Sequence, residues 1–255
     1  MILRRVIAHV RKQEWTAIAI DLVIVVLGVV IGIQVSNWNA ERGDRLAEAG
    51  YLGSLEEDVK SSIASLKDQI AMMERQQAAR ATLLDYANDA DATLLPDERD
   101  RLVAHGLFYL PSLNISQVTF EALKSSGRLG AIRSEALVSE LLAIGADIAA
   151  AQSRERDEIE VTYLFSDPIL VGEFDMSGLF RQPNLHGEPP LPGLPEPRQP
   201  RVSPAVMKSV RFGNILSYRS YFTGERLVFL RKVLARYGEI AALIEARQAE
   251  LGATQ

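Results

Sequence analysis

The chain has 255 residues, no cysteine and a formal net charge of −5. Without cysteine it can hold no disulfide, no thiol nucleophile and no thiolate metal site. Residues 1–36 carry four basic and two acidic side chains, so the remaining residues carry a net charge of −7. Because a nucleic-acid partner needs a basic face, this acidic remainder argues against nucleic acid as the main partner.

The first predicted element is a membrane-spanning helix over residues 17–36. Its core, Ala17–Val35, reads AIAIDLVIVVLGVVIGIQV and contains one charged residue, Asp21. At about 1.5 Å per residue, a helix of this length covers most of a bilayer core of about 30 Å. Trp15 and Trp38 bracket the apolar stretch, as interfacial anchor residues do.

The flanks of this segment predict its orientation. Residues 1–16 form a basic tail, typical either of an amphipathic helix on an anionic membrane surface or of a flexible basic flank. In both cases the positive charge places the N-terminus in the cytoplasm and residues 37–255 outside it. No small-x-small pair follows the span at a cleavage position, so we expect an uncleaved anchor rather than a signal peptide.

One face of the predicted span combines small and polar residues. Asp21, Gly28, Gly32 and Ser36 fall within roughly 80° on a wheel of about 100° per residue. The two glycines form a GxxxG pair, which lets helices approach closely. We interpret this face as a site of association with a second copy or another membrane protein. The alternative is that lipid tolerates the glycines and that Asp21 lies in local water near the membrane surface.

Helical periodicity predicts an all-α fold in which an elongated antiparallel bundle follows the span. Apolar residues at three- and four-residue steps predict one long helix over residues 43–91, with at most a small break at 37–43. Its stripe fits either a parallel dimer seam or the inner face of a bundle, and further helices in the chain favour the bundle. The last helical region, after Ser203-Pro204, has a matching length and is expected to pair antiparallel with this helix.

Prolines and capping residues predict the elements in between. Their expected bounds are 95–111, 116–126 and 134–167, the last capped by Ser134 and ended by Asp167-Pro168. Residues 169–182 have no clear period and fit a strand pair or a packed loop. Residues 183–204 hold eight of the eleven prolines. They predict an extended loop, either a ligand for an aromatic groove or, as we favour, a stiff connector.

No motif indicates catalysis, a cofactor or a metal site. The three histidines, His9, His105 and His186, lie far apart and lack partners at metal-ligand spacing. The acid cluster at residues 155–160 is typical of a solvated helix face, with metal binding as the alternative. The many Arg and Lys residues of the last helical region are likewise expected to form a solvated face.

Two stretches resemble a bacterial family catalogued as a domain of unknown function. They are the anchor with its exit, residues 27–39 (LGVVIGIQVSNWN), and residues 119–127 (TFEALKSSG), together about a tenth of the chain. The resemblance implies an inner-membrane protein with one N-terminal span and a helical domain. Many members carry Glu at the position of Asp21, and because the family has no established activity, no catalytic residue follows from it.

The anchor and the helical domain together predict the class of function. We expect a non-enzymatic, membrane-anchored interaction or scaffold protein of the bacterial inner membrane, with its helical domain in the periplasm. Its partners would be the membrane and either further copies or another membrane protein. The alternative is a periplasmic ligand-binding sensory module acting through a membrane partner, because a cytoplasmic tail of about 16 residues is too short for a signalling domain.

The basic tail makes the topology testable. Alkaline phosphatase folds to an active enzyme only outside the cytoplasm, so its fusion after Gln255 should be active. A fluorescent reporter that matures only in the cytoplasm should be dark at the same position. The opposite pattern would overturn the expected orientation.

Overall fold

The computed structural model describes the backbone of residues 15–184, 187–190, 192–197 and 202–253, and the side chains from residue 22 onward. Across these residues the fold is all-α and contains no strand, which confirms the predicted class. The chain divides into two compact units, Met1–Gly50 (the N-terminal unit) and Tyr51–Gln255 (the bundle unit). The greater part of the basic tail, residues 1–14, lies outside the described residues.

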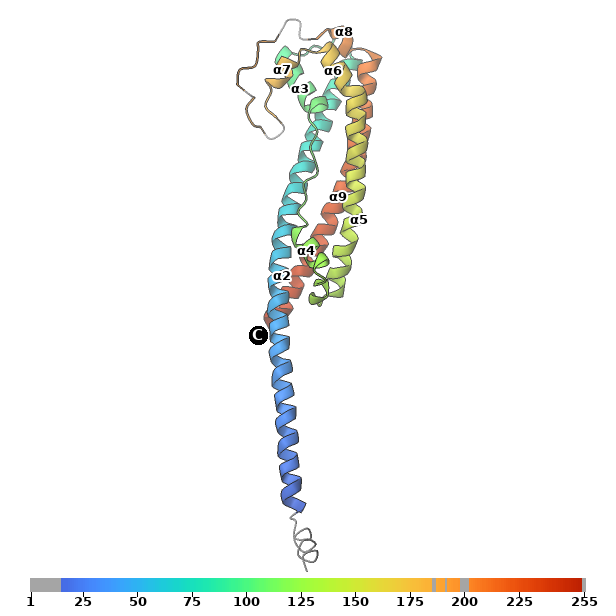
Figure 1. Cartoon of the computed structure of the whole chain (residues 1–255). Helices are drawn as coiled ribbons and strands as arrows, with labels where there is room; N and C mark the ends of the chain where they lie inside the picture. Colours follow the sequence, from blue (N-terminus) through green and yellow to red (C-terminus); the bar gives the residue numbers. More distant parts are fainter. Residues whose placement is uncertain (1–14, 185–186, 191, 198–201, 254–255) are drawn as a thin grey trace, which may run out of the picture. The chain divides into compact units, whose positions relative to one another are not determined.

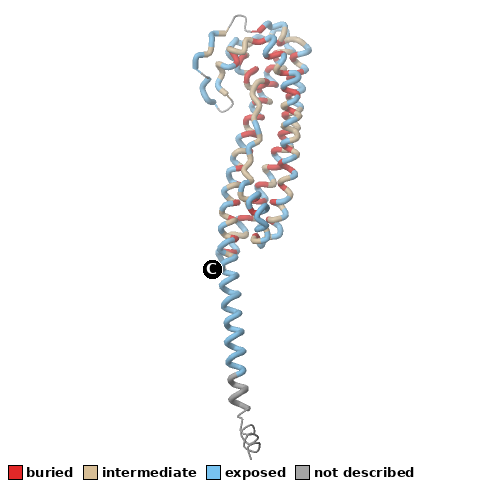
Figure 2. The backbone as a smooth tube through the Cα atoms, viewed as in Figure 1, coloured by how far each residue is buried: buried red, intermediate tan, exposed pale blue. Residues whose placement is uncertain are grey.

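The longest helix, α2 (Trp15–Asn88), runs without a break through residues 37–43, where the sequence allowed for one. In the N-terminal unit, every residue from 22 to 44 is exposed, and Figure 2 colours this part of the tube accordingly. Residues 22–35 are almost all apolar, so the exposed surface of this helix is apolar on every side. A surface of this kind suits lipid better than water.

Three long helices build the bundle unit: α2 from residue 51, α5 (Glu135–Val161) and α9 (Val210–Ala253) (Figure 1). Cross-contacts show that α2 and α9 run antiparallel along their length, as the sequence predicts. These contacts join Gln77 to the Ser220 carbonyl, Glu74 to Arg231, and Glu56 to Gln248. Helix α5 is antiparallel to α9 as well, because Glu140 pairs with Arg236 and Glu158 with Arg226.

Each long helix buries a stripe that advances by alternating steps of four and three residues, the spacing of helices packed in coiled-coil fashion. The stripe of α9 consists of Phe212, Leu216, Arg219, Thr223, Arg226, Leu230, Val233, Tyr237, Ile240 and Ile244. The stripe of α2 consists of Leu52, Leu55, Val59, Ser62, Leu66, Gln69, Met73, Gln76, Arg80 and Leu83. Both stripes are buried within one chain, so the inner face of a bundle is the correct reading of this pattern.

Between α2 and α5 the chain returns along the bundle, partly without helical structure. It forms α3 (Pro96–Val103), the π-helical turn η1 (Ala104–Phe108), α4 (Val118–Ser125) and the short 3₁₀ turn η2 (Leu129–Ala131). Residues 109–117, the return segment, are not helical, so their backbone groups need partners from elsewhere. Polar side chains of the α2 stripe and its neighbours donate to their carbonyls. These bonds run from Ser62 to Ser116 (3.1 Å), Ser65 to Asn114 (2.7 Å), Gln69 to Pro111 (3.3 Å) and Gln76 to Tyr109 (2.6 Å).

The start of α4 is capped by a residue from another helix. Its own N-cap residue, Gln117, makes no side-chain capping bond. Asp58 of α2 takes this role: its carboxylate accepts the Thr119 N–H at 2.7 Å and the Ser116 hydroxyl at 2.9 Å. The far end of α4, Ser125, lies one residue before the predicted bound of 126, and Gly127, with a φ of 69°, closes the helix.

Helix α5 begins as predicted and ends differently. The Ser134 hydroxyl accepts the Leu137 N–H at 3.3 Å, which confirms the cap. The predicted end at Asp167-Pro168 is wrong, because a π-helical turn, η3 (Thr162–Ser166), leads directly into α6 (Asp167–Glu173). This turn restarts the hydrogen-bond pattern, so Pro168 falls in a first-turn position where its missing N–H does no harm. Residues 169–182 are mostly helical, in α6 and α7 (Met176–Phe180), and form no strand pair.

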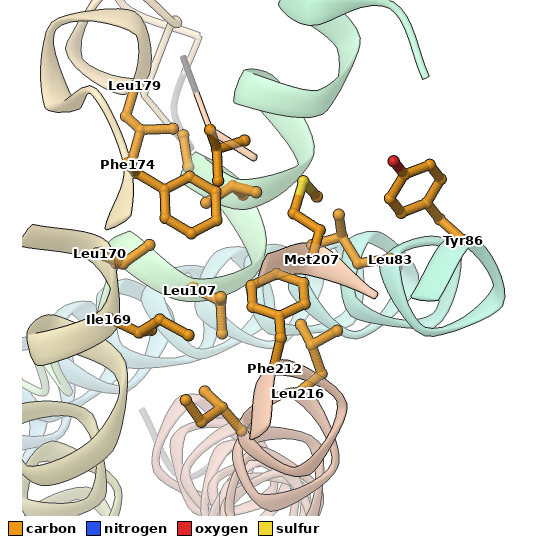
Figure 3. Close-up of a cluster of buried hydrophobic side chains, with 14 residues drawn as sticks. Leu83, Tyr86, Leu107, Ile169, Leu170, Phe174, Leu179, Met207, Phe212 and Leu216 are labelled. Atoms are coloured by element: carbon orange, nitrogen blue, oxygen red, sulfur yellow. The ribbon is translucent and has the colours of Figure 1, made fainter. Parts of the chain in front are cut away.

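An apolar cluster closes the end of the bundle unit where α2 ends and α9 begins. Figure 3 shows side chains from α2, η1, α6, α7, α8 (Pro204–Met207) and α9 converging there, with Leu107, Phe174 and Phe212 among them. The Lys208 ammonium completes the end of α2 by donating to the carbonyls of Asp89, Ala90 and Ala92 at 2.6–3.1 Å. A cation at these carbonyls compensates the negative end of the helix dipole.

The cap on α4 yields a prediction for stability and its pH dependence. Burial by itself raises the pKa of Asp58, but hydrogen bonds from Thr119 and Ser116 outweigh burial and hold the pKa below its usual 3.8. We expect Asp58→Ala to lower the free energy of unfolding by about 1 kcal/mol, measured by urea titration of the full chain in detergent. Glu57→Ala, a change at the exposed neighbouring position, should have little effect.

The sign of the pH effect follows from the lowered pKa. A carboxyl group with a depressed pKa in the folded state stabilises fully above its unfolded pKa and loses that contribution as the pH falls through the folded value. The difference between wild type and Asp58→Ala should therefore be constant from neutral pH to about pH 5 and shrink below about pH 4. A difference that grows on acidification would contradict the role of the ionised carboxylate.

Candidate functional site

The N-terminal helix is long and apolar enough to span a membrane. A second stretch, Glu135–Glu173, passes the same test of length and composition, but it is partly buried in the bundle unit. Its stripe of Leu137, Leu141 and Ile144 belongs to the core. The exposed apolar helix in the N-terminal unit therefore remains the candidate for a membrane anchor.

The backbone places the small residues of this helix on one face. Gly28, Gly32 and Ser36 are separated by four residues each, so all three lie along one side of α2 and all three are exposed. No atom outside the helix lies within 4 Å of the place where a Cβ atom would stand on either glycine. In the single chain this face is open for the close approach of another helix.

Of the remaining anchor residues, the structure describes the side chain of Trp38 but not those of Trp15 and Asp21. Trp38 is 57% exposed, and the guanidinium of Arg42 lies 6.0 Å from its ring centroid, which leaves an aromatic and a cation at the end of the apolar stretch. Asp21 and Trp15 belong to the helical part of α2, but their side chains lie outside the described residues. The proximity of Asp21 to the glycine face therefore rests on helical spacing.

A second site was not expected from the sequence: three arginines lie fully inside the bundle unit. Arg80 of α2 and Arg219 and Arg226 of α9 are each 0% exposed, and we refer to them as the arginine layer. Glu158 of α5, 1% exposed, lies among them. The acid cluster and the basic residues of α9 were expected to be solvated, and for Glu158, Arg219 and Arg226 this expectation is wrong.

Glu158 holds two of the three arginines. Its carboxylate lies 3.2 Å from Nη1 of Arg226 and 3.8 Å from Nη2 of Arg219, and it accepts the hydroxyl hydrogen bond of Thr223. Arg219 also donates to the hydroxyl of Thr162. Arg226 reaches further, to the Pro111 carbonyl of the return segment at 2.6 Å. One carboxylate thereby joins α5 to α9, and one arginine joins both to the return segment.

Arg80 has no carboxylate within 4 Å among the described residues. Its Nη1 donates to the Gly106 carbonyl at 2.7 Å, and Gly106 comes so close that a Cβ atom there would lie 3.3 Å from the Arg80 Cγ. Burial, and then repulsion from Arg219, lowers the pKa of Arg80 to about 9. The guanidinium is therefore still charged at neutral pH, and its partners are backbone and amide oxygens rather than an anion.

The composition of this layer indicates a structural role. Buried charges cost more to desolvate than one pair recovers, but polar residues at core positions fix the register of packed helices. The layer contacts η1 through Gly106 and η3 through Thr162, so both π-helical turns lie next to it. The arrangement can align α2, α5 and α9 with the return segment; it presents no reactive side chain beyond these ion pairs.

The sequence did contain a signal for the arginine layer. Arg219, Thr223 and Arg226 continue the four–three spacing between Leu216 and Leu230, so they occupy core positions of the stripe. The expectation that the arginines of this region face solvent did not take these core positions into account. Two arginines at core positions of one stripe, separated by Thr223, favour a buried acid on a facing helix, and the acid cluster on α5 was the available source.

The described residues offer no metal centre: none of their groups of His, Asp and Glu could hold a metal ion. The Nε2 atom of His105 lies 3.1 Å from the Pro183 carbonyl, whereas His9 and His186 lie outside the described residues. No protein-family model, curated protein or solved structure matches the chain. The resemblance of residues 27–39 and 119–127 to an uncharacterised family stays a prediction.

The arginine layer predicts an asymmetry between two glutamates of one helix. Glu158→Gln leaves buried cations without their carboxylate and should lower the free energy of unfolding by about 3–5 kcal/mol. Glu160→Gln removes the same charge from an exposed position two residues away and should change it by less than about 0.5 kcal/mol. Chemical denaturation of both full-length variants provides the measurement, and equal effects would refute the role of Glu158.

Proposed function

We propose that the chain is a membrane-anchored helical interaction or scaffold protein of the bacterial inner membrane. In this proposal the anchor associates through Asp21, Gly28, Gly32 and Ser36 with a second copy or with another membrane protein. The observation that supports it best is the open small-residue face on an exposed, apolar helix. The bundle unit would project into the periplasm, where its surface is available to partners.

The physical basis of the association is close packing in lipid. Lipid tails are as apolar as the side chains of this helix, so no hydrophobic driving force brings two anchors together. Small residues allow two backbones to approach, which adds van der Waals contacts and weak backbone hydrogen bonds. Gly28 and Gly32 provide this surface over one helical turn, and Ser36 adds a hydroxyl that can donate across the interface.

Asp21 adds a polar element to the same face. It lies about five residues inside the apolar stretch, roughly 7 Å from its start. A carboxylate at such a depth costs on the order of 2–3 kcal/mol or less, and its short side chain reaches the surface poorly. A hydrogen bond between copies, or an ion pair with a basic residue of another membrane protein, would offset that cost and give the face specificity.

The glycine face is tested by bulky substitutions in a membrane two-hybrid assay of self-association. Gly28→Ile and Gly32→Ile should each weaken the signal, because a branched side chain keeps the backbones apart. Val30→Ile, on the opposite side of the same helix, controls for insertion and should leave the signal unchanged. Undiminished association in both glycine variants would remove the homo-oligomer from the proposal.

The role of Asp21 is tested by partner recovery after cross-linking in native membranes. If Asp21→Asn keeps the complex and Asp21→Leu loses it, a neutral hydrogen bond provides the link. If both variants lose the complex, the charge is required. If Asp21→Leu retains every partner and the same oligomer size, Asp21 takes no part in the association.

A further inference from the structure

An apolar groove lies on the outside of the bundle unit, at the end that carries the apolar cluster. It has a volume of about 580 Å³ and is formed by η3 and the first turns of α9. Its walls are largely apolar, and several of their side chains are well exposed, including Val210 at 81% and Leu164 at 58%. Its lining consists of Leu164, Phe165, Val210, Arg211, Asn214, Ile215 and Tyr218.

Aromatic rings form one wall of this groove and continue beyond it. Phe165 and Tyr218 meet edge to face with ring centroids 5.6 Å apart, and Tyr218 lies 5.3 Å from Phe222. Tyr218 is 50% exposed and Phe165 is 46% exposed, so both rings present surface to solvent. The π-helical turn explains why Phe165 faces outward here, since one extra residue per turn rotates the side chains that follow it.

The same end of the bundle unit carries a proline-rich segment with the complementary chemistry. Residues 187–190 and 192–197, the proline loop, contain five prolines and two glutamates, and they form no helix. Arg181 fixes the loop by donating to the carbonyls of Leu194 and Pro195 at 2.8 and 3.1 Å. The prolines stay largely exposed, as does Glu188, so the loop is held in place with its side chains presented outward.

The loop does not cover the groove of its own chain. In Figure 1 the proline loop lies beside α7 and α3 on the left of the bundle unit, whereas α5 meets α6 and α9 begins on the right. The groove is formed at that second position. A loop and a groove on opposite sides of the same end can meet only between two molecules.

The chemistry of the two surfaces matches. Proline-rich segments bind aromatic-lined grooves because their extended conformation is preformed and loses little entropy on binding. Arg211 at the groove is exposed and forms no ion pair among the described residues. The proline loop carries two glutamates. Glu196 pairs with Arg181 of its own chain at 2.9 Å, so the opposite charge comes from Glu188, which is exposed and accepts a hydrogen bond from the neutral Asn184 amide at 2.7 Å. Aromatic rings for the prolines and a cation for Glu188 are the two features by which the groove would recognise this loop.

We propose that the groove of one copy binds the proline loop of a second copy. This contact is separate from the anchor face, because it joins two surfaces of the bundle unit. It is also heterologous, since the loop and the groove are different surfaces, and such contacts can join more than two copies.

Disulfide cross-linking in native membranes tests this contact, because the chain has no cysteine of its own. Two differently tagged full-length copies are co-expressed, one with Pro192→Cys in the loop and the other with Asn214→Cys at the groove. A disulfide needs Cα atoms within about 7 Å, so a heterodimer on a non-reducing gel reports close contact. In the control, the second copy carries Leu142→Cys, an exposed position on α5, in place of Asn214→Cys. Both pairs have the same anchor, so they differ only in the position of the second cysteine.

The proposal predicts a heterodimer with Asn214→Cys and at most a faint one with Leu142→Cys. Adding Tyr218→Ala or Arg211→Glu to the groove copy should reduce its yield severalfold, and Arg211→Glu should do so at an unchanged melting temperature because the Arg211 side chain is exposed. The proposal is overturned if the two cysteine pairs cross-link equally or not at all. It is also overturned if the groove cysteine is linked to a different protein.

Discussion

The bundle unit depends on one constraint: a stretch of non-helical backbone runs along packed helices and must have its polar groups satisfied. The return segment meets this requirement through side chains rather than through a ladder of its own. Ser62, Gln69 and Gln76 occupy core positions of the α2 stripe and donate to its carbonyls, and Glu155 of α5 accepts its Leu113 N–H at 3.2 Å. The buried stripe of α2 therefore carries polar side chains where it faces the return segment. A fourth helix in the place of that segment would need no such partners, and apolar side chains could stand at these positions.

The arginine layer extends the same arrangement to α9. The Pro111 carbonyl accepts from Gln69 of α2 and from Arg226 of α9, and Arg226 pairs with Glu158 of α5. A sliding movement of any one helix by one turn, about 5.4 Å, would break these bonds together. The polar core thus reduces the hydrophobic gain of burial but selects a single register. A rigid unit of this kind suits a scaffold, because it holds the groove and the proline loop at fixed positions.

Much of the fold follows from local patterns in the sequence. The spacing of apolar residues predicted the long helices, the matching lengths of two of them predicted their antiparallel pairing, and Ser134 marked a helix start correctly. Tertiary contacts decided the rest. Pro168 does not end a helix because a π-helical turn precedes it, and Arg219 lies in the core because Glu158 on another helix compensates it. The open glycine face of the anchor followed from four-residue spacing, whereas the groove required the pairing of η3 with α9, which no local pattern specifies.

Hydrogen exchange tests the central claim most directly, namely that helix side chains fix the return segment inside the bundle unit. The backbone amides of Leu113 and Thr119 donate to the carboxylates of Glu155 and Asp58. In the full chain in detergent, peptides covering residues 110–119 should contain amides protected as strongly as those of α5, although residues 109–117 are not helical. Exchange throughout these peptides at the rate of an open loop would contradict the account.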